Sequence, residues 1–83
     1  MKVFLADSNE LIRVGLRSIL ERETRIQIIG EASSSEELLL LCDQLTPENI
    51  IIDYASDGFS IDVVPKFLQK FSDANFIAIT PAQ

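Results

Sequence analysis

Residues 49–55 read NIIIDYA, a run of three isoleucines that ends in a carboxylate. Burying an unpaired carboxylate is costly, so the side chain of Asp53 has to reach water, a cation or a set of hydrogen-bond donors. Continuous apolar runs of this length are typical of strands in a parallel sheet that helices cover on both faces. The predicted strand here spans residues 49–52. Three further short runs, rich in β-branched residues, read in the same way: residues 2–6, 26–30 and 75–80.

Helical patterns separate these runs. Apolar residues between positions 11 and 20 recur at the spacing of one helix face, and Ser8 or Asn9 is placed to cap that helix. Arg13 and Arg17 lie off the apolar face. They could meet a kinase or another domain, but a solvated helix stripe is the favoured interpretation.

Two more helices are predicted downstream. Ser34 and Glu37 have the spacing of a capping box, which opens a helix running through residues 38–45. A third apolar face spans residues 63–71, and Pro65 requires this helix to begin only shortly before it. Cys42, inside the second helix, is interpreted as a small packing residue.

The predicted order is therefore β-α-β-α-β-α-β, an α/β arrangement with right-handed crossovers and an open, doubly wound parallel sheet. The sequence ends at residues 81–83, directly after the predicted fourth strand, which would then form an uncovered apolar edge. We therefore expect the chain to be the front part of something longer. We also expect it to self-associate, as a dimer or by strand exchange.

The composition excludes several classes of protein. A chain of 83 residues with 47% hydrophobic residues suits one small domain. Its net charge of −6 argues against a nucleic-acid surface, which needs clustered Lys and Arg. The single cysteine gives no intrachain disulfide, and no window is apolar enough for a signal peptide or a membrane span. A soluble cytoplasmic domain is expected, with no membrane partner.

Polar residues are expected at the carboxyl ends of three strands: Asp7, Asp53 and Thr80. In open parallel sheets ligands gather at these ends, and neighbouring strands are close enough for two side chains to share one site. Crowded carboxylates favour a cation with oxygen ligands between them, most often Mg²⁺. A carboxylate beside such an ion can attack phosphorus, and Thr80 could donate to a phosphoryl oxygen. The alternative is polar strand ends that face water.

Four stretches resemble a known family in order and separation. Residues 6–16 read ADSNELIRVGL, residues 30–32 read GEA before a Ser-rich cap, residues 47–53 read PENIIID, and residues 77–80 read IAIT. Together they resemble the receiver domain of bacterial two-component response regulators. The likeness is greatest to receivers that precede a LuxR-type helix-turn-helix.

This resemblance implies a flavodoxin-like fold that lacks its final helix-strand-helix, with residues 1–83 forming the N-terminal part of a single receiver domain and no output domain. It implies that Asp53 is the phosphoacceptor, that Asp7 binds Mg²⁺ with Asp53 and the backbone carbonyl of Ala55, and that Thr80 is the switch residue contacting the phosphoryl group. The implied partner is a sensor histidine kinase. DNA would be bound only through a domain absent from this chain. Such a chain is not an enzyme in the usual sense.

The sequence also departs from the family pattern. Ser8 stands where the family has a second acidic residue, which should weaken Mg²⁺ binding. The usual Met-Pro turn after the phosphoacceptor reads Ser56-Asp57, and Pro81 replaces a small residue. These departures favour an alternative function: a degenerate receiver that acts as an interaction or dimerisation module without phosphorylation. Haloacid-dehalogenase-type phosphatases and nucleotide-binding flavodoxin-like proteins fit poorly. The former need an acid at position 55, and the latter need a phosphate loop after the first strand.

Overall fold

The computed structural model describes residues 1–53, 59, 63–70 and 73–78. Its elements follow the predicted alternation of strands and helices: β1 Lys2–Ala6, α1 Glu10–Leu20, β2 Gln27–Ala32, α2 Ser35–Leu45, β3 Asn49–Ile52, α3 Val63–Lys70 and β4 Asn75–Ala78. None of the helices in these ranges is long and apolar enough to cross a membrane.

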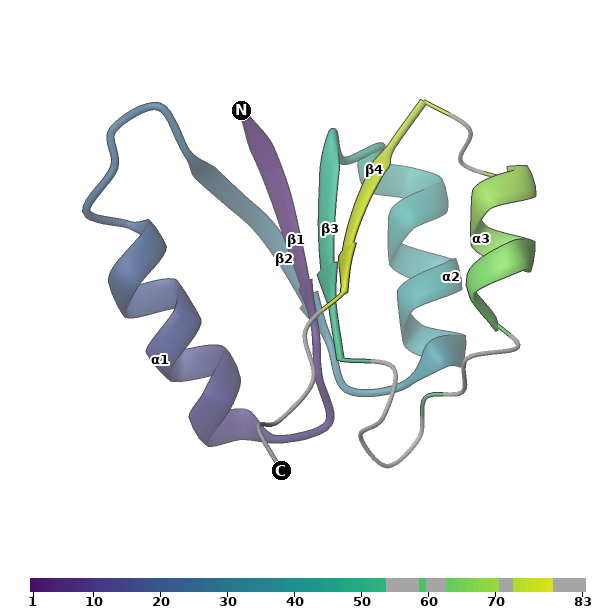
Figure 1. Cartoon of the computed structure of the whole chain (residues 1–83), viewed down its shortest axis with the longest axis horizontal. Coiled ribbons are helices and arrows are strands. Elements are labelled where there is room, and N and C mark those ends of the chain that lie inside the picture. The colour runs from purple at the N-terminus through teal and green to yellow at the C-terminus, as the bar shows by residue number, and fades with distance from the viewer. Residues whose placement is uncertain (54–58, 60–62, 71–72, 79–83) are drawn as a thin grey trace.

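The four strands form one parallel sheet in the order β2-β1-β3-β4. Helix α1 lies on one side of this sheet, whereas α2 and α3 lie on the other (Figure 1). The strand order reverses direction at β1, because the chain first moves from β1 to β2 and then returns past β1 to β3. The predicted doubly wound α/β fold is therefore confirmed, with its switch point between β1 and β3.

Two strands have the predicted bounds and one does not. β1 and β3 match the expected residues, but β2 runs two residues further than expected, through Ala32. The extension arises because Leu5 and Ala6 still have partners in β2, namely Glu31 and Ala32. The prediction that the fourth strand reaches Thr80 lies outside the described residues.

Side-chain caps define where two helices begin. Asn9, not Ser8, caps α1, since its side chain accepts hydrogen bonds from the amides of Leu11 and Ile12. Ser34 caps α2 as predicted, accepting from the amide of Glu37 at 3.3 Å. In a standard capping box the Glu37 carboxylate would accept from the amide of the cap residue, Ser34. Here it accepts from the amide of Ser33, one residue earlier.

The main hydrophobic cluster lies between the sheet and α2. Its buried members come from β1, β2, β3 and α2: Phe4, Ala6, Ala32, Leu38, Cys42, Ile50 and Ile52. Cys42 is a free, fully buried thiol, which confirms the interpretation as a packing residue, and burial raises its pKa to about 11.

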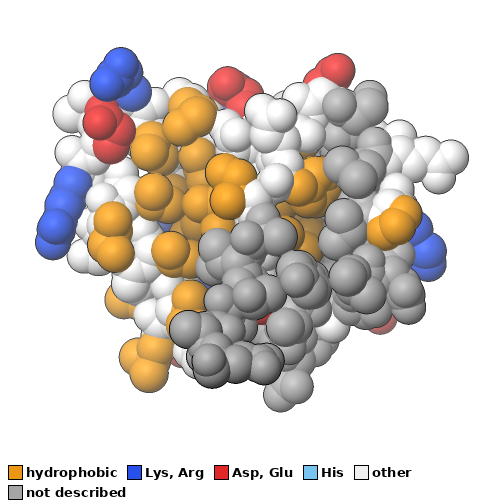
Figure 2. All heavy atoms as spheres, viewed as in Figure 1, with side chains coloured by type: hydrophobic (Ala, Val, Ile, Leu, Met, Phe, Trp, Pro, Cys, Tyr) orange, Lys and Arg blue, Asp and Glu red, His pale blue; other side chains and the backbone are white. Residues whose placement is uncertain are grey.

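The opposite side of the sheet is covered less well. No residue of α1 is buried, and Leu11 and Ile19 are 81% and 61% exposed. These two apolar side chains of α1 therefore lie at the surface of the described part of the chain. Hydrophobic side chains gather at the surface in the half of the molecule that carries α1 (Figure 2). In β4, at one edge of the described sheet, Ile77 is 47% exposed.

Candidate functional site

Asp7 and Asp53 follow neighbouring strands at the switch point of the sheet. The last paired residues of β1 and β3 are Ala6 and Ile52, so the two aspartates come next in register. The backbone amide of Asp53 donates to the carbonyl of Ala6 at 2.9 Å, and that of Asp7 donates to the carbonyl of Ala32 at 3.0 Å. The parallel pairing therefore brings together two carboxylates that are 46 positions apart in the sequence.

Both carboxylates are buried, at 1% and 3% exposure, and not solvated at the rim. The pKa of Asp7 is raised above its ordinary value, first because burial disfavours the charged form and then because Asp53 is close enough to act on it directly. The amide of Asn9 and the charge of Arg13 act in the opposite direction. The alternative of polar strand ends facing water is thus wrong for this pair.

One oxygen of Asp7 is fixed and the other is not. Oδ1 accepts a hydrogen bond from the amide of Asn9 at 2.8 Å. This is an Asx turn, in which an aspartate side chain accepts from the backbone amide two residues later. Oδ2 is buried and has no hydrogen-bond partner within the described ranges. A buried acceptor in this state is costly, and such atoms are typically ones that a cation, a proton or a water satisfies.

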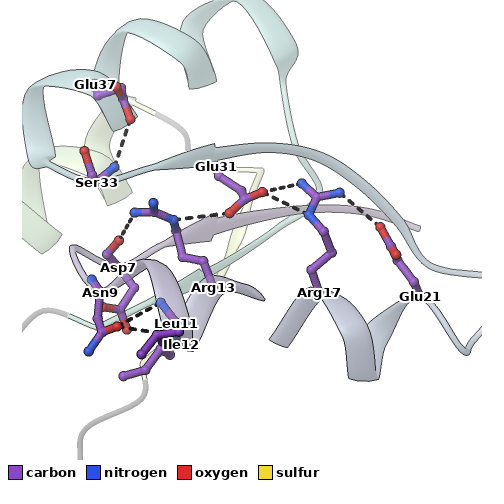
Figure 3. Close-up of polar contacts among 10 residues, drawn as sticks. All are labelled: Asp7, Asn9, Leu11, Ile12, Arg13, Arg17, Glu21, Glu31, Ser33 and Glu37. Carbon is purple, nitrogen blue, oxygen red and sulfur yellow. Dashed lines mark hydrogen bonds and ion pairs between the residues drawn. The ribbon is translucent and has the colours of Figure 1, made fainter. Parts of the chain in front are cut away.

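Arg13 and Arg17 form an ion-pair network with Glu31 at the end of β2 (Figure 3). Arg13 Nε donates to Glu31 Oε1 at 3.2 Å, and Arg17 Nε donates to Oε2 at 2.9 Å. The Arg13 side chain is only 16% exposed. The interpretation of these arginines as a solvated stripe is therefore wrong, because they attach α1 to β2.

The same network reaches the acidic pair. Arg13 Nη1 donates to the backbone carbonyl of Asp7 at 2.6 Å. Sequence reasoning missed this contact, although a signal was present. Two arginines lie one helical turn apart, and the strand that follows them in the chain has Glu31 near its carboxyl end.

Comparisons with known proteins concern the sequence and the fold. No protein-family model matches the sequence. Over 81 residues, covering 96% of this chain, it is 33% identical to the transcriptional regulatory protein LiaR of Bacillus subtilis. Over the same length it is 30% identical to the response regulator UvrY of Escherichia coli. The chain is homologous to response regulators. It spans 37–38% of the length of these curated relatives.

Solved structures show that its fold is that of a receiver domain. The isolated receiver domain of RcsB from Salmonella enterica, studied with a phosphomimetic, matches with a TM-score of 0.92 at 23% identity, covering 100% of this chain and 63% of that one. A structure of two RcsB dimers bound to two parallel DNAs matches with a TM-score of 0.90 at 24% identity, covering 96% of this chain and 43% of that one. At this level of identity the likeness concerns the fold.

The acidic pair of this receiver fold suits a hard divalent cation. Asp7 and Asp53 provide two carboxylates, and Oδ2 of Asp7 still lacks a partner among the described residues. Mg²⁺ is usually held by one or two carboxylates with several waters, so a pair is sufficient. Across the described part of the chain no group of three or more His, Cys, Asp or Glu side chains is placed to hold a metal.

The remaining residues assigned from the resemblance cannot be compared with the structure. Ala55, Thr80 and the Ser56-Asp57 turn lie outside the described residues, as does Pro81. Ser8 follows Asp7, at the position where the resemblance implies a second acidic residue. Among the described residues, the site therefore has two carboxylates, those of Asp7 and Asp53.

Proposed function

We propose that this chain is a signalling receiver that accepts a phosphoryl group on Asp53 from a phosphohistidine of a sensor histidine kinase. One observation carries the proposal: Asp7 and Asp53 are adjacent and buried at the switch point of the sheet, and a buried oxygen of Asp7 has no partner in the described part of the chain. Homology to response regulators supports the same function.

The proposed transfer conserves atoms and charge. A carboxylate oxygen of Asp53 attacks phosphorus and forms a P–O bond, while the P–N bond of the phosphohistidine breaks and its electron pair returns to the imidazole nitrogen. Asp53 comes directly after a buried strand whose last backbone bonds fix its main chain. This attachment holds the nucleophile at a defined place in the sheet. Thr80 would then contact the transferred phosphoryl group.

Asp7 and Asp53, with the backbone carbonyl of Ala55, would hold Mg²⁺ at this site. When bound, the cation would offset the negative charge that develops on the phosphoryl oxygens. With Ser8 in place of a second acidic residue, the ligand set has one negative charge fewer than the family pattern, and we therefore propose weak binding.

The partners follow from the same proposal. As a cytoplasmic phosphoacceptor domain and not an independent enzyme, the chain would regulate a DNA-binding output domain encoded outside these 83 residues. Its own net charge of −6 makes direct DNA binding unfavourable, so any contact with DNA would come through that output domain.

Phosphorylation of the full chain tests this function. The chain is incubated with Mg²⁺ and a small-molecule phosphodonor, and its intact mass is measured. We expect the addition of one phosphoryl group, which is lost in Asp53→Asn and kept in Asp43→Asn. Asp43 is the matched control because it is an exposed carboxylate on α2, with its side chain 63% exposed. Labelling that persists in Asp53→Asn would refute the assignment.

A second function, self-association without phosphorylation, is favoured by the surface of α1. Leu11 and Ile19 are 81% and 61% exposed, and Val14 between them is 56% exposed. Apolar residues clustered in this way are typical of an interaction surface. We propose a second copy of this chain as the partner, because dimers are the commonest assemblies and RcsB, which shares the fold, has been solved as dimers.

Sedimentation over a range of protein concentrations tests the self-association. We expect Leu11→Ser to raise the dimer dissociation constant, because it removes the most exposed apolar side chain of α1. Leu40→Ser is the matched control, since Leu40 is 66% exposed on α2, across the sheet. An equal effect of both substitutions, or a wild-type chain that stays monomeric throughout, would contradict the proposal.

A further inference from the structure

Arg13 connects the acidic pair to the neighbouring strand through two contacts. Its Nη1 donates to the carbonyl oxygen of Asp7 at 2.6 Å and its Nε donates to Glu31 at 3.2 Å, as Figure 3 shows. Glu31 is held in turn by Arg17, whose Nε lies 2.9 Å from Oε2. The guanidinium of Arg13 is therefore fixed at both ends and points at the main chain of Asp7.

The carbonyl of Asp7 needs such a donor. β1 ends at Ala6, and the carbonyl of Ala6 accepts a hydrogen bond from the amide of Asp53, just after β3. The Asp7 carbonyl lies one residue beyond the ladder, within a residue that is 1% exposed. A buried carbonyl without a partner would be costly, and Arg13 provides the partner.

Asp7 is thus held at three points. Its amide donates to Ala32, its carbonyl accepts from Arg13, and its Oδ1 accepts from Asn9. These bonds define the backbone and one carboxylate oxygen, and they leave Oδ2 without a partner among the described residues. A side chain held in this way pays little ordering entropy when its remaining oxygen binds.

We propose that Arg13 is a positioning residue for the acidic site, holding Asp7 so that Oδ2 stays available to a divalent cation shared with Asp53. This inference rests on the proposed function. Arg13 also places a positive charge beside the site, and that charge opposes cation binding. The two effects have opposite signs, so substitution of Arg13 shows which one dominates.

Titration of the full chain with Mg²⁺ alone distinguishes the two effects. Arg13→Gln removes both the charge and the forked donor, whereas Arg13→Lys keeps the charge and loses the fork. If positioning dominates, both variants bind Mg²⁺ more weakly, by about 10-fold or more, as is usual when a residue that orients a metal ligand is removed. If charge dominates, Arg13→Gln binds more tightly and Arg13→Lys is unchanged, which would overturn the inference.

Arg17→Gln is the matched control. It removes the same charge from the same partner, Glu31, one helical turn away. Within the described part of the chain, the side-chain hydrogen bonds of Arg17 go to Glu31 and Glu21 and not to Asp7. We expect its Mg²⁺ affinity to stay within about two-fold of wild type. A loss equal to that of Arg13→Gln would show that the network only stabilises the fold, and it would also overturn the inference.

A second measurement works without any cation. In amide NMR spectra of the metal-free chain, the signal of the Asn9 amide, which donates to Oδ1 of Asp7, should shift in both Arg13 variants and stay unchanged in Arg17→Gln. If wild type shows no saturable response to Mg²⁺, the cation part of the proposed function fails, and the Asn9 signal still decides whether Arg13 positions Asp7. An unchanged Asn9 signal in Arg13→Gln would refute the positioning role.

Discussion

Replacing Asp7 with asparagine should stabilise the folded chain at neutral pH in the absence of divalent cations. In wild type the buried carboxylate of Asp7 faces Asp53, and its Oδ2 lacks a partner in the described ranges. An asparagine keeps an oxygen for the amide of Asn9 and places an NH₂ group beside Asp53. Relieving one unsatisfied buried acceptor is worth about 1–3 kcal/mol, so we expect a gain of that size in the free energy of unfolding.

The gain should depend on pH in a defined direction. The pKa of Asp7 is raised above 3.8 in the fold, so the folded chain binds this proton more tightly than the unfolded chain does. The contribution of Asp7 to wild-type stability is therefore present below pH 3.8 and is lost as the pH rises through the folded-state pKa. The Asp7→Asn variant has no carboxyl group at position 7 to lose a proton. The amount by which its free energy of unfolding exceeds that of wild type should therefore disappear in acid and grow toward neutral pH.

Urea unfolding at neutral pH, with and without Mg²⁺, measures both effects. At a concentration ten times the dissociation constant, Mg²⁺ should raise the free energy of unfolding of wild type by about 1.4 kcal/mol, and it should leave Asp7→Asn unchanged. Asp43→Asn, at an exposed position, should differ from wild type by no more than about 0.5 kcal/mol. A destabilised Asp7→Asn variant that still responds to Mg²⁺ would refute the account of the acidic pair.

Two glycines should respond in opposite ways to alanine. A Cβ at Gly30 would lie 2.6 Å from the ring of Phe4 and 3.0 Å from Leu45, so Gly30→Ala should destabilise the fold, by about 1–3 kcal/mol in urea unfolding. Gly15 in α1 has nothing within 4 Å of that position, so Gly15→Ala should stabilise by about 0.5–1 kcal/mol. A gain at Gly30 would contradict the close packing of β2 on β1. Because the pKa of Cys42 is raised from 9.0 to about 11, the folded chain holds the thiol proton more tightly, and stability should fall between these pH values by up to about 1.4 kcal/mol per pH unit. Unfolding curves recorded from pH 8 to 11 should show this loss, and its persistence in Cys42→Ala would assign it to another group.

The positions of the helices and strands could be predicted because their signals are local. The three isoleucines before Asp53 form β3 with the predicted bounds, and Ser34 caps α2 as its side-chain chemistry requires. Errors arose where partners decided the outcome. β2 extends through Ala32 because residues of β1 remain available for pairing. The arginines of α1 pair with Glu31 of β2, which the pattern of the helix alone did not indicate.

The amino-acid sequence by itself determined the order of elements, the parallel sheet and the placing of Asp7 and Asp53 after neighbouring strands. These properties depend on apolar runs, caps and crossover rules, all of which act over short stretches of chain. Only the tertiary structure decided that both carboxylates are buried, that Arg13 holds the carbonyl of Asp7, and that Leu11 is exposed. Burial and ion pairing join residues far apart in the sequence, so their outcome depends on how the packed elements meet and not on any one segment.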